Sequence, residues 1–217
     1  MEPDRDLVAR ATARVVVLAG PSGAGKSRLA ARLSGAHGWP IVRLDDFYRD
    51  EDDPQMPRSA ELGIIDWDHP DSWDRAAALE ALSLLVAEGR VKTPVYDISA
   101  SRAVDTAVLR ARPDDLILAE GIFAAEIIPD LRELGLLAGA FCVHHHRWVT
   151  FARRLLRDLS ERRKPPLTLV RRGLALVRDE PDLVRRQEAL GAEPARAAHL
   201  EGRLSALAAT TSPDRAL

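Results

Sequence analysis

A short apolar run that leads straight into a glycine-rich turn restricts the fold of this chain more than any other feature. Val15 to Ala19 is apolar and mostly β-branched, which is typical of a strand buried on both faces. Residues 20–27 then fit the pattern G-x4-G-K-[ST]. From Lys26 to Leu33 the apolar residues recur at helical spacing. A strand, a glycine turn and a helix in this order predict an α/β protein that binds phosphate groups where the helix begins.

The residue types of this turn suit a nucleoside triphosphate. Glycines allow backbone N–H groups to face an anion, and the start of the helix adds the positive end of its dipole. The ammonium group of Lys26 would reach the β- and γ-phosphates, and the hydroxyl of Ser27 is a ligand for Mg²⁺. The alternative is a glycine-rich turn without a ligand. We predict a nucleotide-binding turn made of Gly20, Pro21, Ser22, Gly23, Ala24, Gly25, Lys26 and Ser27.

Composition excludes several other classes of protein. A chain of 217 residues that is 46% apolar suits one α/β domain, and a net charge of −2 argues against a protein that holds nucleic acid by bulk electrostatics. No apolar run reaches the roughly 18 residues of a membrane span. One cysteine, Cys142, and an acidic start without a signal-peptide layout lead us to expect a cytoplasmic protein. Because the chain has no asparagine, it lacks the Asn-Lys-x-Asp element with which GTPases usually read guanine.

Further apolar runs predict the rest of the sheet. Residues 41–44, 116–119 and 140–143 are expected to form strands, and their alternation with helical segments predicts a mostly parallel sheet. The expected architecture is a three-layer α/β fold of the P-loop NTPase type, as one domain over residues 1–217. Ser72 is expected to cap the helix that follows it, two helices are expected from Trp148 to Lys164 and over 169–178, and no strand is expected after residue 179.

Two segments of opposite charge frame the predicted site. Residues 45–74 hold eleven acidic and two basic residues, and residues 147–172 hold nine basic and two acidic residues. We interpret the first as an acceptor-side insertion at about 45–74 that is mostly loop. The second is interpreted as an arginine-rich helical lid at about 153–172, since arginines stabilise the charge of a transferring phosphoryl group. A solvated basic face or a nucleic-acid patch are the alternatives for the lid.

Carboxylates follow two of the predicted strands. Asp45 and Asp46 come after the second strand and Glu120 ends the third, at the sheet edge where open α/β sheets bind ligands. Asp45 is suited to be the base that accepts a hydroxyl proton, a Mg²⁺ ligand through water, or both, and Glu120 to orient Mg²⁺. The alternatives are aspartates that cap a turn and a charge that ends a strand.

Other conspicuous side chains have simpler interpretations. The run His144 to His146 alternates faces in an extended segment, so we expect histidines of a strand end and not a metal site. Cys142 is expected in the core, and packing is the favoured interpretation of Trp39, Trp67 and Trp73.

Several segments together resemble one family, the uridine/cytidine kinases of the P-loop nucleoside kinase group. They occur in the family's order between residue 15 and about residue 164. The pairing of an Asp-Phe-Tyr element with an Asp-His-Pro-Asp element is the most specific part of the resemblance. The matching segments are the nucleotide-binding turn, Leu44 to Tyr48, Asp68 to Ser72, Pro94 to Asp97, Glu120 to Phe123 and Arg153 to Arg162.

The resemblance implies a kinase that uses ATP or GTP with Mg²⁺ to phosphorylate the 5′-hydroxyl of a nucleoside, most of all uridine or cytidine. The nucleoside would be its small-molecule partner, with no nucleic acid or membrane partner, and an oligomer is possible. The roles implied are Asp45 as base and metal-site residue, Ser27 and Glu120 as metal-site residues, Tyr48, Asp68 and Tyr96 as substrate contacts, and Arg154, Arg157 and Arg162 around the phosphates, with Arg157 also at the acceptor.

One departure from the family keeps other functions open. The family usually places a His shortly after its Tyr-Asp pair, whereas the run from Tyr96 to Arg102 is one residue shorter and has none. A second hypothesis is therefore a kinase of the same type for another small alcohol, similar to phosphoribulokinase or pantothenate kinase. A third is a nucleotide-binding regulator or ATPase that transfers no phosphate to a small molecule.

Overall fold

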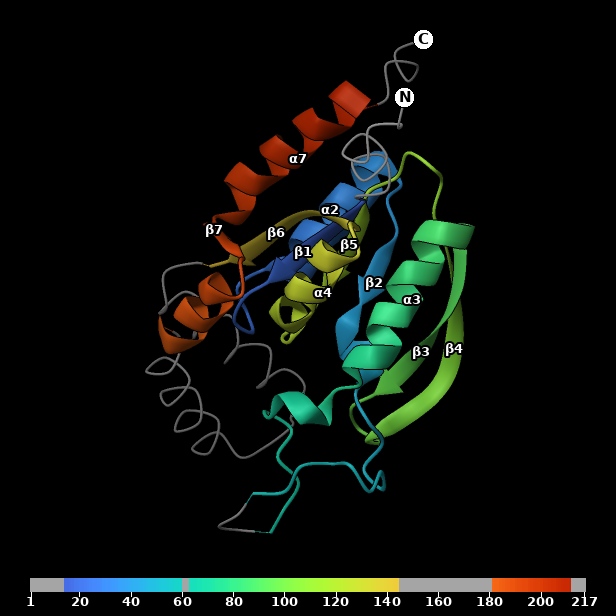
Figure 1. Cartoon of the computed structure of the whole chain (residues 1–217), viewed down its shortest axis with the longest axis vertical. Coiled ribbons are helices and arrows are strands. Elements are labelled where there is room, and N and C mark those ends of the chain that lie inside the picture. The colour runs from blue at the N-terminus through green and yellow to red at the C-terminus, as the bar shows by residue number, and fades with distance from the viewer. Residues whose placement is uncertain (1–13, 60–62, 145–180, 212–217) are drawn as a thin grey trace, which may run out of the picture.

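A parallel five-stranded sheet runs through the middle of the molecule, as Figure 1 shows for the computed structural model, which describes residues 14–59, 63–144 and 181–211. The strand order is β2-β5-β1-β6-β7, and each neighbouring pair is parallel. This arrangement confirms the predicted parallel α/β sheet. The strands are β1 (Val15–Ala19), β2 (Ile41–Arg43), β5 (Ile117–Glu120), β6 (Leu137–Val143) and β7 (Glu193–Ala195).

Helices cover both faces of this sheet, which gives the predicted three layers (Figure 1). Alternate residues of β1 face opposite sides, as a strand buried on both faces requires. Val16 and Leu18 pack in the cluster that contains Leu29 and Leu200. That cluster carries α2 (Lys26–His37) and α7 (Ala197–Thr211). Val15 and Val17 pack in the cluster on the other face, which carries α3 (Arg75–Glu88) and α4 (Ile128–Glu133).

An antiparallel hairpin stands beside the main sheet. It consists of β3 (Arg90–Asp97) and β4 (Arg102–Arg110), which pair along their length with a register shift between Val95 and Tyr96. No apolar run in the sequence predicts this hairpin. The hairpin turn holds residues 98–101, so it lies inside the segment that departs from the family pattern.

Two sequence expectations about helix and strand ends were wrong. Asp74, not Ser72, caps α3, because its side chain accepts a hydrogen bond from the N–H of Ala77 at 2.9 Å. Ser72 is buried and donates its hydroxyl to the carbonyl oxygen of His69 at 2.7 Å. A strand does follow residue 179, since β7 pairs with Phe141 to Val143 of β6.

The arginine-rich lid and the two helices predicted between residues 148 and 178 lie outside the described residues. Within the described ranges, no helix is long and apolar enough to cross a membrane. Cys142, Trp39 and Trp73 are buried in the core as expected.

Candidate active site

The glycine-rich turn joins the end of β1 to the start of α2, as predicted. Three of its glycines adopt positive φ angles, +134° at Gly20, +86° at Gly23 and +98° at Gly25, which side chains rarely tolerate. At Gly20 a Cβ atom would also lie 2.2 Å from the carbonyl oxygen of Val143. The backbone of the turn therefore depends on glycine, and the turn leads directly into the N-terminus of α2, where the helix dipole favours an anion.

Lys26 and Ser27 begin α2 at the centre of this site. The ammonium group of Lys26 is buried and donates to the carbonyl oxygens of Gly20 at 2.8 Å and Pro21 at 3.2 Å. The hydroxyl of Ser27 donates to Oε2 of Glu120 at 2.9 Å. The turn thus brings a cation and a hydroxyl next to a carboxylate at the end of a neighbouring strand.

Glu120 ends β5, which lies between β1 and β2 in the sheet. It is 6% exposed, and its register partners are Leu18 on β1 and Arg43 on β2. Burial raises the pKa of the Glu120 carboxyl and the nearby charge of Asp45 raises it further, although Lys26 and the bond from Ser27 act in the opposite direction. A hydroxyl and a carboxylate are hard oxygen donors, so Ser27 and Glu120 fit the chemistry of Mg²⁺.

The raised pKa of Glu120 predicts a stability change in Glu120→Gln. An acid whose pKa rises on folding costs no stability below its ordinary pKa of 4.5, and costs progressively more as the pH rises towards the folded value. Glutamine keeps an acceptor for Ser27 without the charge. We expect its free energy of unfolding to exceed that of the unmodified chain at pH 8, with a smaller difference at pH 4.5.

Urea unfolding at the two pH values measures this prediction. Glu133→Gln, at an exposed position of α4, is the matched control and should show no such pH-dependent difference. A Glu120→Gln chain that is less stable than the unmodified one at pH 8 would contradict the account of Glu120.

Asp45 lies in the 3₁₀ helix Leu44–Phe47 that directly follows β2. Its Oδ1 accepts a hydrogen bond from the backbone N–H of Ile122 at 2.9 Å, two residues beyond Glu120. Asp46 turns elsewhere, since its carboxylate is 3.8 Å from Arg43 and accepts from the N–H of Tyr96 at 3.4 Å. The structure therefore brings Asp45, and not its neighbour, to the sheet edge that holds Glu120 and the turn.

Gly121 is a residue of this site that the sequence analysis did not single out. A Cβ atom there would lie 2.8 Å from Oδ1 of Asp45 and 2.9 Å from Cβ of Leu44. The missing side chain allows the Asp45 carboxylate to reach Ile122. The only sequence signal was the position of Gly121 directly after a strand-end glutamate.

We expect Gly121→Ala to displace the Asp45 carboxylate. If Asp45 is the base that the sequence analysis expects, kcat should fall about tenfold or more, and the chain should lose about 1–3 kcal/mol of stability because the added methyl group overpacks the site. Gly35→Ala in α2 is the matched control, because a Cβ atom there meets nothing within 4 Å and should raise helix stability by about 0.5–1 kcal/mol. Steady-state kinetics and thermal unfolding measure both variants, and unchanged kcat in Gly121→Ala would refute the proposed crowding.

The acidic segment 45–74 is closed at its base. Tyr48 and Trp73 form an isolated β-bridge, and the N–H of Arg49 donates to the carbonyl oxygen of Ser72 at 2.9 Å. The indole N–H of Trp73 donates to the carbonyl oxygen of Leu44 at 2.6 Å. The residues that enter and leave the segment are thus tied together next to Asp45.

The two tyrosines expected at the acceptor lie close together under this segment. The ring centroids of Tyr48 and Tyr96 are 5.8 Å apart. The hydroxyl of Tyr96 donates to the carbonyl oxygen of Arg49 at 3.1 Å. The hydroxyl of Tyr48 donates to the carbonyl oxygen of Trp67 at 3.4 Å. Burial raises the pKa of both phenols, to about 12 for Tyr96, so both remain neutral hydrogen-bonding groups. Contact of Tyr48 and Tyr96 with a substrate stays a prediction.

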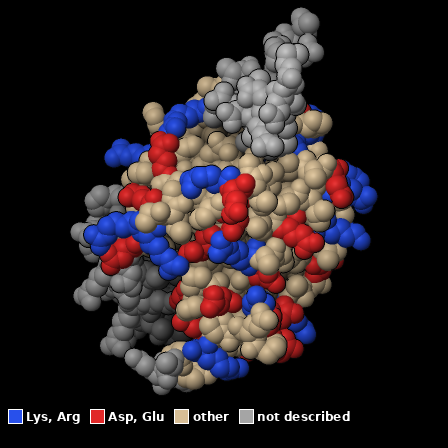
Figure 2. Space-filling model, in the orientation of Figure 1, with Lys and Arg blue, Asp and Glu red and all other residues tan. Residues whose placement is uncertain are grey.

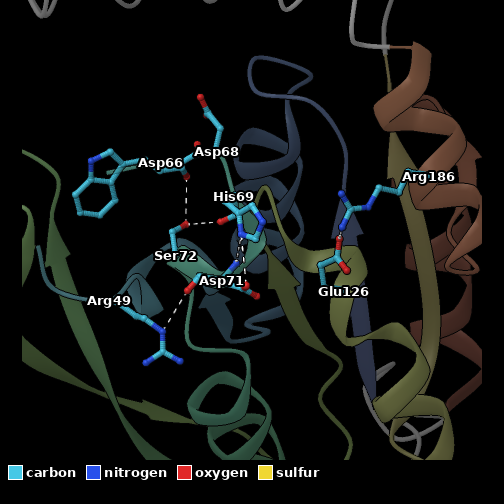
Figure 3. A network of polar contacts seen from close by, with 9 residues as sticks. Arg49, Asp66, Asp68, His69, Asp71, Ser72, Glu126 and Arg186 are labelled. Carbon is cyan, nitrogen blue, oxygen red and sulfur yellow. Dashed lines mark hydrogen bonds and ion pairs between the residues drawn. The ribbon is translucent and has the colours of Figure 1, made fainter. Parts of the chain in front are cut away.

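A cleft of about 1080 Å³ opens beside the acidic segment. Figure 3 shows part of its wall, where Arg49 bonds the backbone of Asp71 and Arg186 pairs with Glu126. Asp68, the third expected substrate contact, lines this cleft as well as a second one of about 680 Å³. Acidic and basic side chains are interspersed on the face that Figure 2 shows, so neither sign dominates that surface.

Some predicted site residues fall outside the described part of the chain. These are Arg154, Arg157 and Arg162 of the expected lid. His145 and His146, which the sequence analysis assigns to a strand end and not to a site, also lie outside it. Among the described residues, no group of three or more His, Cys, Asp or Glu side chains is arranged to hold a metal ion.

The sequence and the fold are similar to those of known proteins. The sequence matches the Phosphoribulokinase / Uridine kinase family over residues 15–166. A uridine kinase of Deinococcus deserti is 31% identical over 168 residues, which are 76% of this chain and 77% of that protein. A uridine kinase of Clostridium botulinum is 28% identical over 167 residues, 76% of this chain and 78% of that protein. A solved structure, a putative fructose transport system kinase from Silicibacter sp., covers 89% of this chain and 98% of its own length, with a TM-score of 0.59 and 20% identity, and supports the fold alone.

Proposed function

This chain belongs to the phosphoribulokinase and uridine kinase family, whose members are phosphotransferases, and on that premise we propose that it is an ATP-dependent nucleoside kinase. The γ-phosphoryl group of ATP would pass to the 5′-hydroxyl of a nucleoside, with uridine and cytidine as the first candidates. The observation that carries the proposal is the bond from Ser27 to Glu120, which puts the nucleotide-binding turn next to a strand-end carboxylate and to Asp45.

The turn at residues 20–27 would bind the phosphates of ATP or GTP. Backbone N–H groups and the Lys26 ammonium hold negative oxygens in such a turn. Ser27, Glu120 and Asp45 are the residues we assign to Mg²⁺, which when bound neutralises charge on the phosphate oxygens. Arg154 and Arg162 are proposed to contact the phosphates, and Arg157 the phosphates and the acceptor.

Asp45 would act as the base. As the acceptor hydroxyl oxygen bonds to the γ-phosphorus, the bond between that phosphorus and the β–γ bridging oxygen breaks, and the hydroxyl proton passes to the Asp45 carboxylate. Oδ1 is held by the N–H of Ile122, so we assign Oδ2 to the incoming hydroxyl. Most of the rate acceleration would come from positioning and charge stabilisation.

We assign the approach of the acceptor towards Asp45 to the cleft of about 1080 Å³, whose lining includes neither Asp45 nor Tyr48 or Tyr96. On that assignment, the charge of the cleft favours an uncharged acceptor. Its lining includes six acidic side chains against three arginines, and the arginines form ion pairs. A phosphorylated sugar would meet a net negative wall, whereas a nucleoside carries no charge to be repelled. Asp68 on this wall, with Tyr48 and Tyr96 beneath the segment, would contact the nucleoside.

A panel of acceptors tests the proposal. Uridine, cytidine, adenosine, fructose, ribulose 5-phosphate and pantothenate would each be incubated with γ-labelled ATP and Mg²⁺. We expect label to be transferred to uridine or cytidine and not to the two anionic acceptors. Transfer to ribulose 5-phosphate or pantothenate alone would overturn the nucleoside assignment, and ATP hydrolysis that no acceptor changes would overturn the kinase.

A second candidate is a kinase for another uncharged alcohol. It is favoured by the hairpin turn, where the family's His is absent and Ile98 is 65% exposed, so the position offers an apolar side chain. Transfer of label to adenosine or fructose and not to pyrimidine nucleosides would support this candidate.

A further inference from the structure

Gln187 is a buried polar side chain for which the proposed reaction has no role so far. It lies in the helical segment at residues 181–189, beyond the residues 15–166 that match the family, and it is only 3% exposed. A buried amide is retained at a cost unless both of its ends find partners. The contacts of Gln187 therefore show what it holds in place.

Both ends of the Gln187 amide are used. Oε1 accepts from the thiol of Cys142 at the end of β6, with 3.3 Å between sulfur and oxygen, and Nε2 donates to the carbonyl oxygen of Ile122 at 3.4 Å. A carbonyl oxygen can only accept, so the NH₂ group must face Ile122 and the oxygen must face the thiol. The Ile122 carbonyl thus fixes the orientation of the Gln187 amide, and the Cys142 thiol is the partner of the oxygen at its other end.

Ile122 connects this contact to Asp45. Its carbonyl is held by Gln187, and its N–H donates to Oδ1 of Asp45 at 2.9 Å. The peptide group before the Ile122 Cα atom is therefore bonded to Asp45, and the peptide group after it is bonded to Gln187. Gly121 precedes Ile122 and has no side chain to restrain the backbone, so these hydrogen bonds define how the N–H is aimed.

The segment that carries Gln187 is itself anchored. Arg186 pairs with Glu126 at 2.7 Å, as Figure 3 shows, and Val184 and Leu190 pack against the core cluster. The N–H of Ala192 donates to the backbone carbonyl of Gln187 at 3.0 Å. A fixed amide can hold the Ile122 peptide in one orientation.

We propose that Gln187 is a positioning residue for phosphotransfer, which acts through Ile122 to aim the Asp45 carboxylate at the acceptor hydroxyl. The inference rests on the proposed function, in which Asp45 is the base. It assigns a role in the active site to a residue of the C-terminal segment that touches neither substrate.

Gln187→Met is the variant that tests this role, because methionine has a similar shape and no amide. We expect kcat for the preferred acceptor to fall about tenfold or more, while KM for ATP and for the acceptor changes less than about twofold. Val184→Ala, which removes packing from the same segment, is the matched control. It should lower the Tm and leave kcat within about twofold.

A double-mutant cycle separates positioning from general damage. If Gln187 acts through Asp45, then Gln187→Met added to Asp45→Asn should leave the residual transfer rate unchanged. An equal fold-loss in both backgrounds, or normal kcat in Gln187→Met, would overturn the inference. If Gln187→Met fails to fold, Cys142→Ala replaces it in the same cycle, since loss of the thiol removes the partner of Oε1 and weakens the anchoring of the amide.

The same assays distinguish failure of the proposed function from failure of the role inferred for Gln187. An unmodified chain that transfers phosphate to none of the acceptors would refute the proposed function and this inference with it. An active unmodified chain with an equally active Gln187→Met variant would refute the inference alone.

Discussion

Replacing Lys26 with alanine should reduce transfer of the γ-phosphoryl group by about 10²-fold or more, the loss typical when a charged group that stabilises a transition state is removed. Lys26 is the cation of the nucleotide-binding turn, and its ammonium already lies against the carbonyl oxygens of Gly20 and Pro21. Transfer of label from γ-labelled ATP to the acceptor measures the loss. Circular dichroism and the Tm report whether the fold is kept.

Lys92→Ala is the matched control for this experiment. The chain has only three lysines, and Lys92 lies exposed on β3 of the hairpin. It should retain full activity. A Lys26→Ala enzyme that still transfers phosphate at more than about a tenth of the normal rate would mean that the turn does not bind the reacting phosphates.

Asp45→Asn should cost about 10²–10⁴-fold in kcat, the contribution usual for a positioned general base. Asparagine keeps the shape of the side chain and an oxygen for the Ile122 N–H, but it cannot accept the hydroxyl proton. We expect KM for ATP to change little, because the turn at residues 20–27 is untouched. Steady-state kinetics with ATP and the acceptor varied separately give both constants.

Asp46→Asn provides the comparison for Asp45→Asn. Both residues belong to the same 3₁₀ helix, but the Asp46 carboxylate faces Arg43 and the N–H of Tyr96. Its kcat should stay within a few fold of the unmodified value. If Asp46→Asn were inactive and Asp45→Asn active, the two aspartates would have to exchange roles.

The central sheet could be predicted because its strands are buried on both faces. Val15 to Ala19 and the apolar run that ends β6 contain continuous apolar residues, and sequence patterns identify such strands directly. β7 has only the residues Glu-Pro-Ala, so nothing in its composition indicates a strand. It exists because the edge of β6 offers hydrogen-bonding groups, which only the assembled sheet reveals.

The sequence of the hairpin carries a signal of another kind, the alternation of β-branched residues. Val104, Thr106 and Val108 place β-branched residues at every second position of β4, after the turn residues Ser99 to Ser101. Because β4 is largely exposed, it contains no continuous apolar run of the kind that marks a buried strand. A search for alternation, in place of apolar runs, would have found both strands.

Some residues of the candidate site are marked by the local sequence, and others depend on contacts between distant parts of the chain. The sequence places the glycine-rich turn, Asp45 and Glu120 each beside a strand, and the structure brings them together, while their functional roles stay predictions. Gly121 and Gln187 were not predicted, because their importance depends on atoms of Asp45 and Ile122 that only folding brings near. Asp74 caps α3 in place of Ser72 because the indole of Trp73 is bonded to Leu44 and Ser72 beside it is buried at the base of the acidic segment.

The tied base of that segment has a consequence for engineering. Tyr48 pairs with Trp73 across its two ends, so the polypeptide between them forms a loop whose attachment points are fixed by the scaffold. An exchange of this loop between relatives would have to keep its contacts with the hairpin, where the N–H of Ala103 donates to Asp50 and the hydroxyl of Tyr96 donates to the carbonyl oxygen of Arg49. Under the proposed function, we expect a transplanted loop to carry acceptor preference with it, while the residues of the glycine-rich turn stay with the recipient.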